Sequence, residues 1–406
     1  MSGTTKRSRP FEAGDSPYLV ERMQGFGTTI FAEMSALAVA TGAINLGQGF
    51  PDEDGPDEVK QAARQAIADG LGNQYPPGIG VPELRHAVTG HQHRFYGLTV
   101  DADEEVLVTC GATEAIAAAL LALLDDGDEA IAFEPYYDSY AACISMAGAV
   151  RRPVTLRPPA YELDVDALRA AVTPRTRLIL LNSPHNPTGK VFTADELAAI
   201  AAVAQDRDLL VVSDEVYEHL TFDGRPHIPI ATLPGMWERT VTIGSAGKSF
   251  SFTGWKVGWV TGPAALVSAV RTAKQFLTYV ASGPFQYAAA VGLRLPDVYF
   301  ERVRDQLQDK RDRLSDGLAD AGFTVYRPQG TYFVTADIRS LGVDDGVAFC
   351  RSLPERCGVV AIPTVVFYDD VDAGRPLVRF ACCKRLPVLD AAVERLQSLS
   401  SERPVT

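Results

Sequence analysis

The stretch Thr242-Ile243-Gly244-Ser245-Ala246-Gly247-Lys248-Ser249-Phe250 places a single amine after an apolar, β-branched segment and among very small residues. Small neighbours leave room for a bulky group on the lysine nitrogen. Burial readily lowers the pKa of a lysine, and Schiff-base lysines become reactive in this way. Lys256 follows in Gly254-Trp255-Lys256-Val257-Gly258-Trp259. A second cation so close to Lys248 indicates that an anion, most simply a phosphate, is held beside it.

Two other interpretations of Lys248 need to be weighed. Gly247-Lys248-Ser249 matches the end of a nucleotide-binding P-loop, G-x-x-x-x-G-K-[ST]. The first glycine of that motif is replaced by Thr242, which argues against a triphosphate site. Most lysines lie on the surface. Among the lysines of this chain, however, only Lys248 and Lys256 lie in charge-poor surroundings of glycine and aromatic residues.

The bulk composition narrows the class of protein. With 406 residues, the chain can form two or three domains of about 150 residues each. A net charge of −13 argues against nucleic-acid and anionic-membrane partners, and no run approaches the roughly 20 apolar residues of a membrane span. The six cysteines show neither CxxC spacing nor a disulfide framework, so we expect a reduced, cytoplasmic protein. The histidines lack HExxH or paired spacing, so we expect no metal.

Helical and strand patterns alternate from about residue 57 to residue 300. The predicted strands are short continuous apolar runs, which are typical of a sheet buried on both faces. They cover residues 105–109, 129–133, 178–181, 209–213 and 241–244. The predicted helices cover residues 56–68, 113–124, 137–146 and 195–205. This alternation predicts an α/β domain with a mostly parallel sheet and site residues at the strand ends.

The pattern changes after about residue 296. A long amphipathic helix at 298–321 is followed by strands at 332–336, 359–362 and 377–382 and by helices at 345–357 and 388–399. We expect four parts: a disordered leader at 1–26, an N-terminal arm at 27–50 that joins the small domain, a large domain at 51–296 and a small α+β domain at 297–406. The leader is basic and then polar, unlike a secretory signal.

Polar residues that follow apolar strands suit the same site as Lys248. Asp214 ends one strand, and a buried carboxylate needs a partner. A protonated pyridine nitrogen or an arginine would serve. Tyr217 could then donate a hydrogen bond to the phenolic oxygen of the same ring. Asn186 lies in the irregular loop Asn182-Ser183-Pro184-His185-Asn186-Pro187-Thr188-Gly189-Lys190, whose proline and turn pieces are individually common.

Two further segments indicate anion binding. Thr109-Cys110-Gly111-Ala112-Thr113-Glu114-Ala115 joins a strand to a helix and leaves backbone amides free at the helix start. We expect Glu114 to lie on the outer side of that helix. Arg379 interrupts an apolar strand in Val378-Arg379-Phe380. Its partner is either a substrate carboxylate or an internal acid.

In this order along the chain, these residues resemble the class I/II aminotransferases, which are fold-type I enzymes that use pyridoxal 5'-phosphate (PLP). The resemblance covers nearly the whole chain after about Gly27. It includes Asn45-Leu46-Gly47-Gln48-Gly49-Phe50-Pro51, Asn73-Gln74-Tyr75, Glu134-Pro135-Tyr136-Tyr137 and Pro328-Gln329-Gly330-Thr331-Tyr332-Phe333. The motifs are similar to the kynurenine/glutamine/methionine aminotransferase subgroup, and the C-terminal third to actinobacterial N-succinyldiaminopimelate aminotransferases. The resemblance implies a large PLP-binding domain with a mostly parallel sheet flanked by helices, a smaller α+β domain and a homodimer.

The resemblance also implies roles for the matching residues. Lys248 forms the Schiff base with PLP and moves a proton, and Asp214 pairs with the pyridinium nitrogen. At the cofactor ring, contacts are implied for Tyr217 and Asn186 with the phenolic oxygen and for Tyr137 with the ring face. The phosphate contacts are implied for Gly111, Ala112, Thr113, Ser245 and Lys256, and for Tyr75 from the neighbouring subunit. Substrate contacts are implied for Gly49, Asn186 and Arg379. Where the chain departs from the kynurenine enzymes, we expect Ser282 and either Phe31 or Ile30 to line the substrate pocket.

The implied reaction transfers an amino group from an L-amino acid to a 2-oxo acid in ping-pong half-reactions. A PLP-dependent C–S β-lyase would use the same lysine, aspartate and arginine, so elimination stays open. A regulator built on this fold ranks last, because no DNA-binding segment is added. Ala281 and Ser282 replace the aromatic and histidine side chains of kynurenine enzymes. The substrate therefore stays open among glutamine, methionine, aromatic amino acids and succinyl-diaminopimelate.

Overall fold

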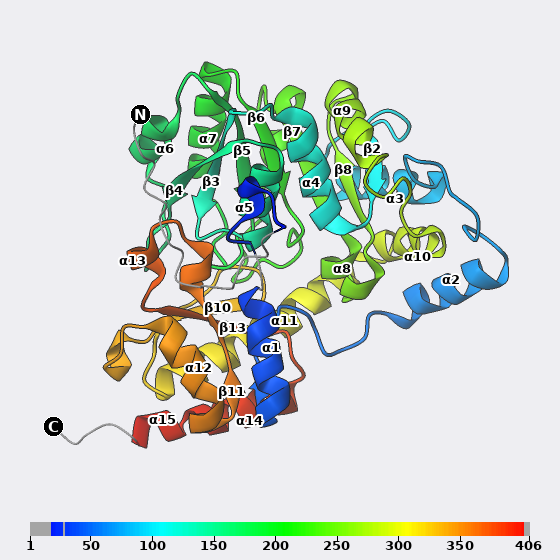
Figure 1. Cartoon of the computed structure of the whole chain (residues 1–406). Helices are drawn as coiled ribbons and strands as arrows, with labels where there is room; N and C mark the ends of the chain where they lie inside the picture. Colours follow the sequence, from blue (N-terminus) through cyan, green and yellow to red (C-terminus); the bar gives the residue numbers. More distant parts are fainter. Residues whose placement is uncertain (1–17, 27–28, 402–406) are drawn as a thin grey trace.

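The computed structural model describes residues 18–26 and 29–401, and a seven-stranded sheet forms its centre (Figure 1). The strand order is β2-β8-β7-β6-β5-β3-β4. The strands are β2 (Val106–Thr109), β3 (Glu129–Glu134), β4 (Val150–Thr155), β5 (Thr176–Asn182), β6 (Leu210–Asp214), β7 (Thr240–Ser245) and β8 (Gly258–Thr261). Only β8 runs antiparallel to its neighbours, so the sheet is mostly parallel, as predicted.

Helices cover both faces of this sheet, which explains its continuous apolar strands. Successive strand residues point to opposite faces. Ile179 and Leu181 of β5 belong to a core shared with α6 and α7, whereas Leu178 and Leu180 belong to a core shared with α4 and α5. These helices are α4 (Gly111–Leu123), α5 (Asp138–Met146), α6 (Val165–Ala171) and α7 (Ala194–Asp206), and α9 (Ala264–Lys274) packs beside α4.

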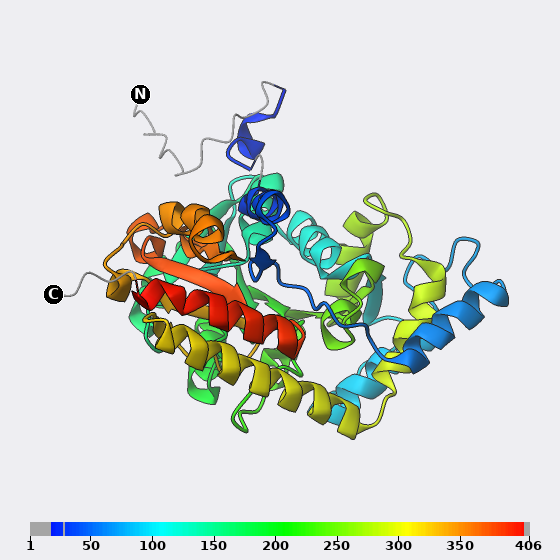
Figure 2. The same cartoon turned by 90° about the horizontal axis from the view of Figure 1, so that it is seen from below.

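A second sheet lies below the first in Figure 1 and is antiparallel. Its order is β12-β13-β10-β9, from β9 (Thr324–Tyr326), β10 (Phe333–Asp337), β12 (Ile362–Pro363) and β13 (Leu377–Ala381). The long helix α11 (Asp297–Asp320) lies beside α14 (Leu386–Leu396), as Figure 2 shows. The other helices of this part are α12 (Gly346–Cys357), α13 (Val371–Gly374) and α15 (Ser398–Ser401).

The chain before residue 50 contacts this second part. Strand β1 (Ile44–Asn45) pairs in parallel with β11 (Val359–Val360), and α1 (Ile30–Thr41) packs against α12. Of the predicted leader at 1–26, residues 1–17 lie outside the described residues, as do residues 27 and 28. Residues 18–26 contain the 3-10 turn η1 (Glu21–Met23), and the Arg22 carbonyl accepts a hydrogen bond from Ser145 Oγ.

A third group of helices packs at one side of the large sheet. It consists of α2 (Asp57–Ala68), α3 (Pro82–Tyr96) and α10 (Gly283–Leu293). The short elements are α8 (Ala246–Ser249), η2 (Ile230–Thr232), η3 (Trp237–Arg239), η4 (Thr253–Trp255), η5 (Arg339–Leu341) and η6 (Thr364–Phe367). Within the described residues, no helix is both long and apolar enough to cross a membrane.

Most predicted elements are confirmed to within a few residues. The predicted helix at 113–124 is α4, which begins earlier because Gly111 turns the chain directly from strand to helix. The prediction of one strand at 359–362 is wrong, since Ala361 separates β11 from β12 and the two join different sheets. The sequence patterns also missed the following elements: α1, α3, α6, α9, α10, β4, β8 and β9.

Candidate active site

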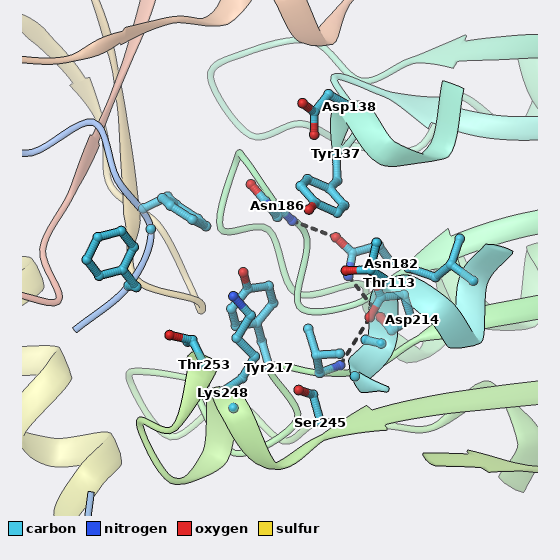
Figure 3. Close-up of a pocket in the computed structure, with 18 of the residues that line it drawn as sticks. Thr113, Tyr137, Asp138, Asn182, Asn186, Asp214, Tyr217, Ser245, Lys248 and Thr253 are labelled. Atoms are coloured by element: carbon cyan, nitrogen blue, oxygen red, sulfur yellow. Dashed lines mark hydrogen bonds between the residues drawn. The ribbon is translucent and has the colours of Figure 1, made fainter. Parts of the chain in front are cut away.

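A cavity of about 430 Å³ lies where strands of both sheets end (Figure 3). Residues from the ends of β6 and β7, the starts of α4 and α5, and strand β13 line it. Most predicted site residues meet here: Phe31, Gly49, Gly111, Ala112, Thr113, Tyr137, Asn186, Asp214, Tyr217, Ser245, Lys248, Lys256 and Arg379. The fold therefore collects side chains that are far apart in the sequence into one pocket.

Lys248 extends into the cavity from α8, which directly follows β7. Its Nζ donates a hydrogen bond to Tyr332 Oη at 3.0 Å, and that hydroxyl donates to the Gly49 carbonyl at 2.7 Å. Burial lowers the pKa of Lys248 to about 8. The amine is thus held in one position and loses its proton around pH 8, well below the usual range of a lysine. Tyr332 belongs to one of the sequence motifs that carry the resemblance, but nothing in its local sequence predicted the hydrogen bond with Lys248.

Asp214 is the last residue of β6 and is only 4% exposed. Its Oδ2 accepts a hydrogen bond from Tyr140 Oη at 2.6 Å, and its Oδ1 accepts one from the Val216 amide at 3.3 Å. Burial raises the pKa of Asp214 to about 6. Within the described residues, no arginine or lysine forms an ion pair with this carboxylate. It therefore faces the cavity with acceptor capacity left for a cationic group. Tyr140 was missed by sequence reasoning.

The loop after β5 is tied to the Asp214 strand. Asn182 Nδ2 donates to the Asp214 carbonyl at 2.8 Å, and the Asn186 amide donates to Asn182 Oδ1 at 2.7 Å (Figure 3). Figure 3 shows Asn186 and Tyr137 on the side of the pocket opposite Lys248 and Tyr217. Burial raises the pKa of Tyr137 to about 12 and that of Tyr217 further, so both phenols keep their protons.

The start of α4 forms an anion-binding end of the cavity. Gly111 has φ +73°, and a Cβ at this position would lie 3.2 Å from Lys256 Cε. Lys256 Nζ in turn donates to Thr113 Oγ1 at 3.3 Å. Free amides, a hydroxyl and an ammonium group therefore converge on one spot.

The expectation that Glu114 lies on the outer side of α4 is wrong. Glu114 is 8% exposed, and its carboxylate accepts hydrogen bonds from the Cys110 amide and from Thr278 Oγ1. These two donors hold the side chain under the first turn of the helix. Glu114 does not line the cavity.

Arg379 projects from β13 and is buried, and no acidic side chain among the described residues forms an ion pair with it. Its Nη1 donates to Asn186 Oδ1 at 3.2 Å and its Nη2 to the Gly47 carbonyl at 3.0 Å, whereas Nε has no partner. The guanidinium carbon lies 4.0 Å from the ring centre of Phe333 and 5.2 Å from that of Phe31. Burial lowers the pKa of Arg379 to about 10. The alternative of an internal ion pair is not realised among the described residues, and the guanidinium is available to a carboxylate from outside.

Two predicted site residues do not line this cavity. Tyr75 is 80% exposed, and its ring contacts Tyr279 at 5.4 Å between ring centres. Ser282 lies at the start of α10. Both belong to a region with other exposed aromatic side chains, including Phe276 at 83% exposure.

Comparisons with known proteins agree with this geometry. The family model for aminotransferase class I and II matches residues 41–396. A probable N-succinyldiaminopimelate aminotransferase from Mycobacterium tuberculosis is 53% identical over 95% of this chain and 100% of its own length, and the methionine aminotransferase of Escherichia coli is 40% identical over 93% and 97%. The solved structure of the Mycobacterium tuberculosis enzyme has a TM-score of 0.92 at 54% identity, covering 94% of this chain and 100% of that one.

The cavity also fits PLP on its own chemistry. A buried carboxylate without a cation, Asp214, suits the pyridinium nitrogen, and the amides and ammonium around Gly111 suit the phosphate. Lys248 supplies an amine with a lowered pKa between them. The chain belongs to the class I and II aminotransferases, PLP-dependent fold-type I enzymes that transfer amino groups from amino acids to 2-oxo acids.

Proposed function

We propose that this chain is a cytoplasmic homodimer that transaminates N-succinyldiaminopimelate, with Lys248 as the lysine that links covalently to PLP. The observation that carries the site assignment is the placement of Lys248, Asp214 and Arg379 in a single cavity, where Asp214 and Arg379 are buried and none of the three forms an ion pair within 4 Å with a described residue. The substrate rests on the Mycobacterium tuberculosis relative, which is named for it and aligns over its full length.

The buried residues have separate tasks in this proposal. Bound PLP supplies a ring that accepts electron density from the substrate Cα. Asp214 keeps the ring nitrogen protonated, and Tyr140 holds the carboxylate in place. Arg379 grips the substrate α-carboxylate through the two terminal nitrogens of its planar fork. Lys248, whose pKa is about 8, takes a proton from the substrate Cα and later returns one.

The dimer is supported by the side chains left outside the cavity. Tyr75, Phe276 and Tyr279 are large aromatic residues with exposures of 80%, 83% and 54%. Exposed aromatic clusters mark interaction surfaces. In the proposed dimer this surface is covered by the second subunit, and Tyr75 reaches the neighbour's phosphate site.

The test is an absorbance scan of purified holoenzyme with one amino donor at a time and no oxo acid. We expect N-succinyl-L,L-diaminopimelate to discharge the yellow form, with stoichiometric formation of pyridoxamine phosphate and an oxo acid, and at lower concentrations than methionine, glutamine or kynurenine. If one of these three donors is preferred, the substrate proposal fails while the aminotransferase assignment stands. Catalytic release of ammonia would instead show elimination.

A further inference from the structure

A buried group of two imidazoles and a carboxylate lies outside the active-site cavity. His91 comes from α3, while Glu218 and His219 follow β6. One potential ligand atom from each residue lies within 4.8 Å of the others, and His91 Nε2 is 2.7 Å from His219 Nε2. None of the three lines the cavity around Lys248. The cluster therefore has no part in the site described above.

The carboxylate of the cluster is buried and held by a phenol. Glu218 is 5% exposed, and its Oε2 accepts a hydrogen bond from Tyr96 Oη at 2.6 Å. In the described part of the chain, no arginine or lysine lies within ion-pair distance of Glu218. Glu215, a second buried carboxylate of the same segment, contacts His227 Nε2 at 2.9 Å. Buried carboxylates without a cation are costly.

The two imidazoles of the cluster face each other through their ring Nε2 atoms, and an imidazole nitrogen is a common metal ligand. Aromatic rings surround them: Phe95 and Phe300 lie 4.7 and 4.2 Å from the ring centre of His219. An aromatic shell of low polarity strengthens the attraction between a cation and its ligands.

We propose that His91, Glu218 and His219 bind a zinc ion or a chemically similar divalent transition metal. Two imidazole nitrogens and a carboxylate oxygen form a donor set that zinc accepts, whereas magnesium and calcium prefer oxygen ligands alone. In tetrahedral coordination with metal–nitrogen distances of about 2.1 Å, the two ligand nitrogens lie about 3.4 Å apart. The Nε2 atoms of His91 and His219, which are 2.7 Å apart, would therefore need to separate by less than about 1 Å. A hydrogen bond between neutral imidazoles would explain their contact, but it leaves Glu218 uncompensated.

The position of the ion assigns it a structural role. Glu218 and His219 directly follow Tyr217, which lines the active-site cavity. A metal held by these two residues and by His91 fastens this segment to α3. The ion therefore fixes the backbone that carries Tyr217 without reaching the reacting groups.

The experiment uses tag-free, full-length holoenzyme purified without added metal and measures its metal content by mass spectrometry. We expect about one zinc per chain. The metal content of the His91→Gln variant should be at least about tenfold lower than that of the wild type. His93→Gln is the matched control, because His93 is exposed on the same helix, and it should keep the metal. A wild-type protein without metal, or a His91→Gln protein that retains it, overturns the proposal.

A second measurement covers the case in which His91→Gln does not fold. Metal-stripped wild-type holoenzyme is titrated with cobalt(II), whose visible bands report tetrahedral nitrogen and oxygen coordination. We expect saturable bands at one equivalent per chain, a rise in Tm, and displacement of the bands by zinc. Absence of cobalt bands with an unchanged Tm overturns the proposal by itself.

Discussion

At the scale of single residues, the lowered pKa of Lys248 predicts how the apoenzyme captures PLP. Only the neutral amine attacks the cofactor aldehyde, and the amine is protonated below its pKa. The capture rate should therefore rise with pH, reach half of its maximum near pH 8 and level off above that pH. For an ordinary lysine the half-maximum would lie near pH 10.5. Stopped-flow absorbance across a pH series measures this. A rate still climbing at pH 10 would contradict the assigned environment of the lysine.

The hydrogen bond from Tyr140 to Asp214 also makes a residue-scale prediction. Tyr140→Phe removes a donor to a buried carboxylate and raises the pKa of Asp214 further. A hydrogen bond to a charged group contributes about 1.5–3 kcal/mol, so kcat should fall by about 10- to 100-fold. The pH at which the acidic limb of activity appears should move upward.

The control for this variant is Tyr161→Phe. Tyr161 is buried, and its hydroxyl has no hydrogen-bond partner in the described structure. It does not line the active-site cavity. Its kcat and pH profile should match those of the wild type. Equal losses in both variants would show that Tyr140 acts through general packing.

At the scale of elements, the turn from β2 into α4 makes the proposed phosphate site. Gly111→Ala places a methyl group 3.2 Å from Lys256 Cε and forces a left-handed backbone on alanine. Such a backbone costs about 1–2 kcal/mol. We expect weaker PLP binding, measured by equilibrium dialysis of the apoenzyme, in addition to the loss of stability.

Gly127→Ala separates these two effects. Gly127 also has a positive φ, +84°, but nothing lies within 4 Å of an added Cβ. Its variant should lose similar stability in denaturant unfolding and keep the wild-type affinity for PLP. If both variants bind PLP equally well, the contact with Lys256 plays no part in the phosphate site.

Element boundaries show where sequence reasoning is strong. Strands β5 and β6 were predicted because both of their faces are buried, which leaves an uninterrupted apolar run. Helix α3 was missed because its buried residues include Arg85, His91 and Gln92, which look like surface residues in the sequence. Their burial depends on partners in other elements, such as the Gly80 and Ala102 carbonyls that accept hydrogen bonds from Arg85.

At the scale of the whole molecule, the proposed dimer can be tested by mixing two inactive chains. Tyr75→Ala should weaken the neighbour's phosphate site, and Lys248→Ala removes the reacting amine. In a hybrid dimer, one site combines the intact Lys248 of the first chain with the intact Tyr75 of the second. Random assembly on co-expression makes about half of the dimers hybrids, each with one intact site of two, so activity should recover to about a quarter of that of the wild type. Refolded mixtures no more active than either parent would place Tyr75 outside the neighbouring site.

The sequence by itself determined the family, the cofactor and most lining residues of the cavity. The reason is that the proposed reacting groups lie at the ends of apolar strands or helix starts, where local pattern and chemistry coincide, as in Asp214 at the end of β6 and Lys248 after β7. Tertiary structure alone decided which groups support them. Tyr140 and Asp214 are 74 positions apart, Lys248 and Tyr332 84, and His91 and His219 128. Contacts over such separations leave no local pattern, because they form only when packing brings different elements together.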